Sequence, residues 1–423
     1  MGAEDAGGRW SRRGMLGGTV VAAGGLVGGL GSADGSASGS STPRPGGRYP
    51  FRGAHQAGIV TPAQDRMYFA SFDVITKQRR DLVWLMKDWT TAAERMTRGQ
   101  DAAPQGAFGS RPDLPPLDTG EAADLPPSGL TLTFGFGPTL FTKDGADRFG
   151  LASHQPGLLQ PLPAFSSDEL DRRRCGGDLC VQACADDPQV ALHAVRMLAR
   201  IGSGVVRLRW SQVGFGRTSS TDQAQATPRN LFGFKDGTAN IRAEDRAGLD
   251  THVWVDTDDD PAASWLGGGT YLVARRTSMD IEGWDDQSLI EQESQVGRDK
   301  RFGAPLSGGE ENSAPDFEDP GSSSPLIPHN SHLRLMHPDF NGGARMLRRG
   351  YSFLDGNDAR GRLDAGLFFI AFIRNPETHF IALQRVMDRH DAMAQWLRVN
   401  GSALFAVPPG IAKDGFIGQT LLG

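Results

Sequence analysis

Residues 232–242 read Phe-Gly-Phe-Lys-Asp-Gly-Thr-Ala-Asn-Ile-Arg and carry the strongest signal in the chain. They fix one carboxylate, Asp236, in a Gly-x-x-Asp-Gly turn between Gly233 and Gly237. Neither glycine has a side chain, so the pattern predicts a backbone that a flat ligand can approach closely. Asp-Gly is also among the commonest turn dipeptides, and on this segment alone a turn-capping role for Asp236 is the simpler interpretation.

A second signal is a group of three histidines, His329, His332 and His337, in a chain with nine histidines in all. Such a group first suggests a site for a bare metal ion. Its His-x-x-His-x-x-x-x-His spacing fits no standard zinc pattern, however, and no cysteine lies near it.

A third signal is the pair Arg348 and Arg349 in the segment Met-Leu-Arg-Arg-Gly-Tyr, residues 346–351. Neighbouring residues of a strand point to opposite faces, so only one of the two guanidinium groups can reach a given pocket. A fixed guanidinium stabilises negative charge where it develops during a reaction.

Hydrophobic periodicity predicts strands at 67–74, 130–136, 178–185 and 204–215 and helices at 79–96 and 188–201. Strand, helix, strand, then strand, helix, strand is the ferredoxin-like order. The second half predicts strands at 269–276 and 366–374, a helix beginning at 288–295 and a long helix at 379–400. Segments 99–128 and 308–324, rich in Gly, Pro, Ser and acidic residues, are predicted loops.

The three signals, in this order and at about this separation, resemble the dye-decolourising peroxidases from about Pro50 to Gly423. The segment Gly176-Gly177-Asp178-Leu179 resembles in particular the subgroup exported through the twin-arginine pathway, which includes the deferrochelatase/peroxidase proteins. The resemblance implies an α+β fold in which two ferredoxin-like halves form a β-sheet core with peripheral helices, as in the dimeric α/β-barrel superfamily. It implies an N-terminal half at 50–220 and a C-terminal half with the haem site at 221–423.

The resemblance also implies one haem b per chain, with His332 as the axial ligand of the iron. Pro328, His332, Leu333 and Arg334 match the family's pattern around this ligand. Asp236 is expected to move a proton on bound peroxide, and Arg348 to stabilise the departing negative charge. The other implied haem contacts are Gly237, Thr238, Ala239, His337, Pro338, Leu367 and Phe369.

Several of these assignments have alternatives. The apolar segment 366–369, which includes Leu367 and Phe369, is explained almost as well by plain core packing. Arg349 and Arg334 are interpreted as haem-propionate or surface partners, and His329 as a residue that either supports the iron ligand or lies at the surface. Since a solvated carboxylate is a feeble base near pH 7, Asp236 predicts an acidic activity optimum.

The implied activity is oxidation of dyes, phenolics or other bulky reductants by hydrogen peroxide through a ferryl intermediate. A closed pocket excludes bulky donors, so electrons are expected to come through aromatic residues at the surface. The candidates are Trp254, Trp265, Tyr271, Trp284, Tyr351 and Trp396. A haem-handling, deferrochelatase-like role with iron-uptake partners and a non-catalytic haem carrier are the alternatives, and a homo-oligomer is left open.

The N-terminal segment Ser-Arg-Arg-Gly-Met-Leu, residues 11–16, precedes a glycine-rich, weakly apolar run. Residues 1–41 are therefore predicted to be a twin-arginine signal peptide and linker, cleaved near Ala33 or Ala37. A retained anchor would need about 20 strongly apolar residues. Export of the folded protein to the periplasm or medium suits a cofactor that is acquired in the cytoplasm.

The composition fits a soluble globular body, with 38% hydrophobic and 22% charged residues and a net charge of −6. No basic stripe neutralises phosphates, which argues against nucleic acid as a partner. The three cysteines, Cys175, Cys180 and Cys184, are interpreted as buried thiols, with a Cys175–Cys180 bridge as the alternative. The acidic run at 256–260 is interpreted as a solvated loop rather than a cation site.

Overall fold

The computed structural model describes residues 47–109, 111–318 and 324–423. The predicted signal peptide at 1–41, with Arg12, Arg13 and both candidate cleavage sites, lies outside the described residues. Within the described ranges, no helix combines the length and the apolar character that a membrane crossing requires.

The first six predicted elements are all present and form a ferredoxin-like unit. They are β1 (Arg66–Val74), α1 (Arg79–Thr97), β2 (Thr131–Phe136), β5 (Leu179–Ala185), α3 (Pro188–Ile201) and β6 (Val206–Arg217). The strands pair antiparallel in the order β2-β5-β1-β6. Short elements lie between β2 and β5: α2 (Pro138–Phe141), β3 (Thr142–Lys143), β4 (Ala146–Asp147), and 3-10 turns at Ala152–His154 and Arg172–Arg174.

Helices α1 and α3 pack on this sheet because each carries an apolar stripe. The predicted stripe of α1 is buried: Leu82, Leu85, Met86 and Trp89. Trp89 also donates its indole N–H to the carbonyl oxygen of Leu198 in α3, at 2.8 Å. Helix α3 begins at Pro188, and the Asp187 carboxylate caps it by accepting two backbone N–H bonds of the first turn.

The C-terminal half repeats this order. Its strands are β7 (Thr270–Met279), β8 (Leu347–Arg348), β9 (Tyr351–Asn357), β10 (Leu363–Ile373) and β11 (Leu397–Val407). The ladder β9-β10-β7-β11 is the ferredoxin-like order, and β8 also pairs with β10. The helices are α4 (Arg246–His252), α5 (Ile281–Asp285), α6 (Leu289–Val296), α7 (His332–Leu335), α8 (Ala382–His390) and α9 (Gln419–Leu422), with 3-10 turns at Pro261–Leu266 and Pro338–Phe340.

The predicted long helix at 379–400 is wrong. The chain forms a π-helical turn at Glu377–Ile381, then α8, a 3-10 turn at Ala392–Trp396, and strand β11. Asp391 ends α8 in an extended conformation, and its carboxylate caps the following turn by accepting the N–H of Met393. From Leu397 the chain pairs with β7 over ten partnered positions, and this tertiary pairing outweighs the helical preference of the sequence before it.

The two halves share one sheet that closes on itself. β6 pairs with β9, β11 pairs with β2, and β10 pairs with β7, so all of the nine strands except β8 form a ring. Aromatic side chains of both halves meet inside it: the ring of Phe69 in β1 lies 5.4 Å from Phe368 in β10 and 6.1 Å from Phe405 in β11. The expected core of two ferredoxin-like halves is confirmed.

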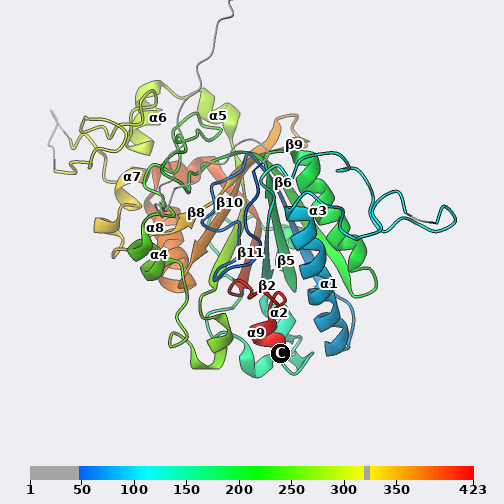
Figure 1. Cartoon of the computed structure of the whole chain (residues 1–423). Helices are drawn as coiled ribbons and strands as arrows, with labels where there is room; N and C mark the ends of the chain where they lie inside the picture. Colours follow the sequence, from blue (N-terminus) through cyan, green and yellow to red (C-terminus); the bar gives the residue numbers. More distant parts are fainter. Residues whose placement is uncertain (1–46, 110, 319–323) are drawn as a thin grey trace, which may run out of the picture. The chain divides into compact units, whose positions relative to one another are not determined.

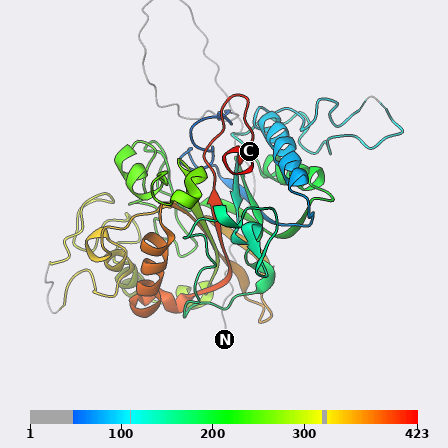
Figure 2. The same ribbon diagram turned by 90° about the horizontal axis from the view of Figure 1, so that it is seen from below.

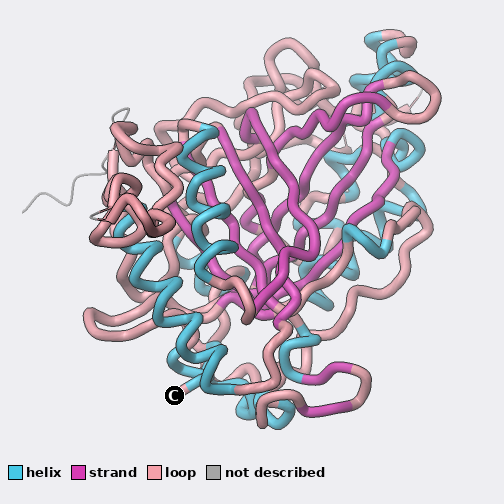
Figure 3. The backbone as a smooth tube through the Cα atoms, turned by 90° about the vertical axis from the view of Figure 1, so that its right-hand side faces the viewer, coloured by secondary structure: helices cyan, strands magenta, loops and turns pink. Residues whose placement is uncertain are grey.

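Helices cover opposite outer sides of this sheet. Figure 1 shows α1 and α3 beside the strands of the N-terminal half and α4, α7 and α8 beside β8 and β10, and Figure 2 shows the same separation from below. In Figure 3, two long helices lie in front of the strands of the sheet. The site residues of the C-terminal half therefore lie on the side away from α1 and α3.

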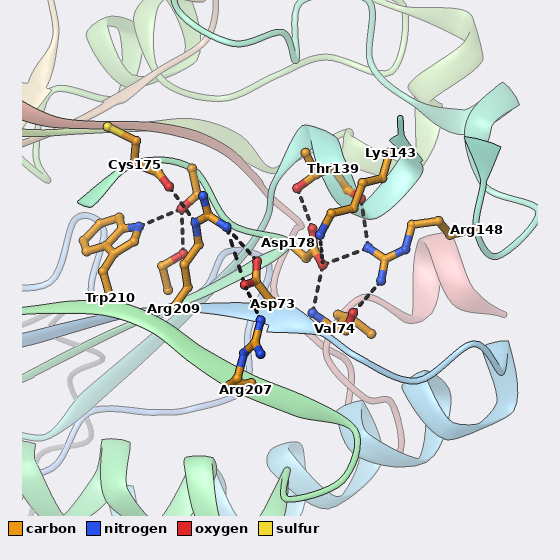
Figure 4. A network of polar contacts seen from close by, with 12 residues as sticks. Asp73, Val74, Thr139, Lys143, Arg148, Cys175, Asp178, Arg207, Arg209 and Trp210 are labelled. Atoms are coloured by element: carbon orange, nitrogen blue, oxygen red, sulfur yellow. Dashed lines mark hydrogen bonds and ion pairs between the residues drawn. The ribbon is translucent and has the colours of Figure 1, made fainter. Parts of the chain in front are cut away.

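The segment Gly176-Gly177-Asp178 has a structural role (Figure 4). The fully buried Asp178 carboxylate accepts the backbone N–H of Val74 and a bond from Arg148, both at 2.8 Å, with Lys143 at 3.7 Å. Gly177 has a φ of 133°, and a Cβ there would lie 1.9 Å from the hydroxyl of Ser71. The segment thus ties β5 to β1, with a carboxylate buried among its partners.

The cysteines are free thiols. Cys180 and Cys184 are buried in β5, as predicted, and burial raises the pKa of both. Cys175 is half-buried and donates to the carbonyl oxygen of Asp171, so the alternative Cys175–Cys180 bridge does not form. In the acidic run, Asp259 pairs with Arg374 at 2.6 Å.

Candidate active site

Asp236 lies in a tight turn that the neighbouring backbone defines. Its N–H donates to the carbonyl oxygen of Pro228 at 2.9 Å, and the amide of Asn230 donates to its Oδ2 at 3.2 Å. Gly233 and Gly237 have φ values of 83° and 94°, a region that favours glycine. A Cβ on Gly237 would lie 2.8 Å from the Cα of Ser219. The turn thus requires both glycines, and close packing against Ser219 adds a second reason at Gly237.

Arg348 reaches Asp236 from β8. Its Nη1 donates to Asp236 Oδ1 at 3.0 Å, and about a quarter of its side chain is exposed. The backbone of Arg348 is held by the side chain of Asn240, which accepts its N–H at 2.7 Å and donates to its carbonyl oxygen at 2.9 Å. The turn that carries Asp236 therefore also holds the residue that pairs with it.

Arg349 points the other way. It is fully buried, so the interpretation as a propionate or surface partner is wrong for this residue. Its guanidinium donates to backbone and side-chain oxygens of the segment 59–64 and to Thr221, and a close contact with Gln64 is part of this network. Arg349 thereby anchors β8 inside the protein.

His332 begins α7 and is paired with a carboxylate that the sequence interpretation missed. Its Nδ1 lies 2.6 Å from Oδ2 of Asp391, a residue that is 6% exposed. Burial alone lowers the pKa of His332, but the charge of Asp391 and its hydrogen bond more than offset this, so the pKa is raised. Because Nδ1 donates to Asp391, Nε2 is the nitrogen available to a metal.

The His332 side chain is partly open. Its accessible fraction is 37%, although the carboxylate of its partner Asp391 is fully buried. The charges of Arg348 and Asp236 both act on this ring, so the pair lies in its neighbourhood. Leu367 and Phe369 are also partly exposed, although β10 is paired with β7 at both positions. An imidazole with a free nitrogen and a charged pair in its neighbourhood fit an iron cofactor such as haem.

The other expected contacts are less closely grouped. Thr238 donates to Glu311 at 3.2 Å, and Pro338 begins the turn Pro338–Phe340. The ring of His337 packs edge-on against Phe317. Gly237 lies against Ser219, as above, and Ala239 is exposed within the same turn. These positions adjoin the Asp236 turn or follow α7 without making a bond to Asp236, Arg348 or His332.

The remaining residues around α7 serve the protein's own packing. Arg334 donates to the carbonyl oxygen of Phe317 at 2.8 Å and its guanidinium lies 4.5 Å from the ring centre of Phe340. His329 is exposed. Within the part of the chain that the structure describes, no three His, Cys, Asp or Glu side chains converge as a group that could hold a bare metal ion.

Most of the aromatic residues expected at the surface are buried, so that expectation is wrong for five of the six. They are Trp254, Trp265, Tyr271, Trp284 and Tyr351. Trp396 alone among the six is partly exposed. Its ring meets Trp284 edge-on at 6.0 Å, and Trp284 stacks on Phe232 at 4.4 Å. Trp284 also meets Phe234 edge-on at 6.0 Å, so the connected rings end two residues before Asp236.

Comparisons with known proteins identify the family of this chain. The family model described as Dyp-type peroxidase, N-terminal, matches residues 56–216, and its C-terminal counterpart matches residues 227–412. A deferrochelatase of Escherichia coli (strain K12) is 36% identical over 382 residues, which cover 89% of this chain and 87% of that relative.

Solved structures give the same result. Ferric DtpA from Streptomyces lividans superposes with a TM-score of 0.80 at 41% identity, covering 89% of this chain and 97% of that one. A DyP-type peroxidase from Cellulomonas bogoriensis superposes with a TM-score of 0.77 at 36% identity, covering 89% of this chain and 98% of that one. The family models together span most of the sequence, and this chain belongs to the Dyp-type family of haem-dependent peroxidases.

Proposed function

We propose that this protein is a haem b peroxidase in which His332 would hold the iron and Asp236 and Arg348 would act on hydrogen peroxide. The observation that carries the proposal is an oriented histidine with a carboxylate–guanidinium pair in its neighbourhood. His332 has its Nδ1 engaged by Asp391, and Arg348 and Asp236 form a pair at 3.0 Å whose charges act on the His332 ring.

When bound, haem supplies the iron at which the O–O bond of peroxide is cleaved. Asp236 would take a proton from peroxide with one carboxylate oxygen and return it to the oxygen that leaves as water. Arg348 would donate to the leaving oxygen as negative charge gathers there, which is the point at which a fixed cation contributes most. Asp391 holds the ring of His332 in one tautomer and increases the basicity of Nε2.

The test of this proposal compares Asp236→Asn and Arg348→Leu with the parent protein in the hydrogen-peroxide-dependent oxidation of a dye. Asparagine keeps the size of Asp236 but removes the base, so its cost should shrink as pH rises and hydroperoxide anion becomes available. Leucine removes a fixed charge and should lower kcat/KM for peroxide at every pH by about 10²–10³-fold. Haem content, measured beside activity, should stay at the parent value in both variants.

A haem-handling role is the second candidate, since the deferrochelatases are 36% identical to this chain. Haem-loaded protein incubated with a ferrous chelator distinguishes the two. Release of iron with recovery of intact protoporphyrin would support haem handling, whereas retention of iron during sustained dye oxidation would support the peroxidase.

We also propose export by the twin-arginine pathway, on the basis of Arg12 and Arg13 followed by a weakly apolar run. Replacing both arginines by lysine should leave haem-loaded protein in the cytoplasm. Normal amounts outside the inner membrane would remove this proposal.

A further inference from the structure

The side chain of Asn240 makes three hydrogen bonds to backbone groups of other segments. Its Oδ1 accepts the N–H of Arg348 at 2.7 Å, and its Nδ2 donates to the carbonyl oxygens of Arg348 at 2.9 Å and Ser220 at 3.0 Å. Asn240 is 5% exposed. A buried amide with both ends engaged has one favoured position, because any rotation leaves buried polar groups without partners.

These bonds replace a strand that β8 lacks. β8 has two residues, and Arg348 is paired across the ladder with Ala371 of β10. On the other side of β8, Asn240 engages both main-chain groups of Arg348, as a neighbouring strand would. The backbone from which the Arg348 side chain extends is therefore fixed from both sides.

Asn240 also links the two residues proposed to act on peroxide. It lies four positions after Asp236, and its own N–H donates to the carbonyl oxygen of Gly237 at 3.0 Å. One short turn thus carries the carboxylate and holds the backbone of the guanidinium that pairs with it, although Asp236 and Arg348 are 112 residues apart. A displacement of about 1 Å between two catalytic groups is enough to lower a rate substantially.

We propose that Asn240 is a positioning residue that sets where the guanidinium of Arg348 lies relative to Asp236 and to a ligand of the haem iron. This inference rests on the proposed function, since it takes Arg348 as the group that donates to that ligand. Asparagine is required because the position needs one acceptor and two donors. Aspartate would instead place a carboxylate against two carbonyl oxygens.

Gln56 provides a matched control in the N-terminal half. It is a buried amide whose Oε1 accepts the N–H of Phe134 at 2.8 Å and whose Nε2 donates to the carbonyl oxygens of Phe134 at 3.1 Å and Pro408 at 2.9 Å. The pattern of bonds is the same as that of Asn240, but it holds β2. Gln56→Ala therefore measures the cost of losing such an amide in a part of the protein that has no role in the site.

The probe is fluoride, a small anion that binds ferric haem and accepts a hydrogen bond from a guanidinium. In haem-loaded protein, Asn240→Ala should raise the Kd of fluoride by about 10-fold or more, as expected when one charged hydrogen bond is lost. Asn240→Ser, which keeps an acceptor for the N–H of Arg348, should raise it less and serves if the alanine variant does not fold. Gln56→Ala should leave the Kd unchanged at a comparable loss of Tm.

The decisive comparison is the double variant. If Asn240 acts through Arg348, Asn240→Ala should add nothing to the effect of Arg348→Leu on the fluoride Kd. An unchanged Kd in Asn240→Ala and Asn240→Ser, or additive effects in the double variant, would overturn the inference. If Arg348→Leu itself leaves fluoride binding and peroxide turnover unchanged, the proposed function fails instead.

Discussion

Replacing Asp391 by asparagine removes the negative charge that lies 2.6 Å from Nδ1 of His332. Asparagine keeps an acceptor for the N–H of Met393, so the turn after α8 should persist. The charged hydrogen bond is worth about 1.5–3 kcal/mol. For a one-electron couple, about 59 mV corresponds to a tenfold change in equilibrium constant. Loss of the charged hydrogen bond should therefore raise the ferric/ferrous potential by about 60–130 mV.

The direction follows from charge, because the Asp391 carboxylate stabilises the more positive ferric state through His332. Spectroelectrochemical titration of haem-loaded protein measures the potential. Asp388→Asn is the control, since Asp388 lies in α8, the helix that Asp391 ends, but accepts bonds from Ser166 and Ser167. An unchanged potential in Asp391→Asn, or an equal rise in Asp388→Asn, would refute the role assigned to Asp391.

Three further outcomes are expected. Burial and the neighbouring His252 lower the pKa of His379 from 6.5 to about 4. The folded protein is therefore fully stable with respect to this group above pH 6.5, and it loses stability as the pH falls from 6.5 to about 4. Allowing for partial exposure, His379→Gln should remove about 1–2 kcal/mol of this acid dependence, measured by urea unfolding at several pH values. Asp178→Asn should cost about 3 kcal/mol in urea unfolding at pH 7, because it leaves Arg148 without its buried partner; a loss near zero would contradict the role given to that carboxylate. Trp396→Phe should slow oxidation of a bulky dye but not of a small phenol in steady-state assays, because Trp396 is partly exposed and meets Trp284; equal slowing of both donors would argue against a surface route.

Local patterns were sufficient for most of the fold. The apolar stripe of α1, the Pro188 start of α3 and the apolar run of β10 each lie within one element, and each was predicted within a few residues. The segment from residue 379 failed because its outcome depends on distant strands. Leu397 to Val407 pairs with β7, which precedes it by more than a hundred residues, and no local pattern contains that information.

The site residues also differ in whether the local sequence or a distant contact reveals them. Asp236, His332 and Arg348 stand in recognisable segments, and the structure pairs Asp236 with Arg348 in the neighbourhood of His332. Asp391 and Asn240 were missed because each acts through a bond to a residue that is distant in sequence, 59 and 108 positions away. A signal for Asp391 was present: aspartate before Ala-Met-Ala is typical of a cap and marks the end of α8.

The iron–histidine stretching band in the resonance Raman spectrum of the ferrous, haem-loaded protein tests the central claim most directly, namely that His332 holds the iron. The band should be present in the parent protein, absent from His332→Gly, and restored when imidazole is added to that variant. A band that persists in His332→Gly without imidazole would mean that another residue ligates the iron, and the site built here around His332 and Asp391 would be wrong.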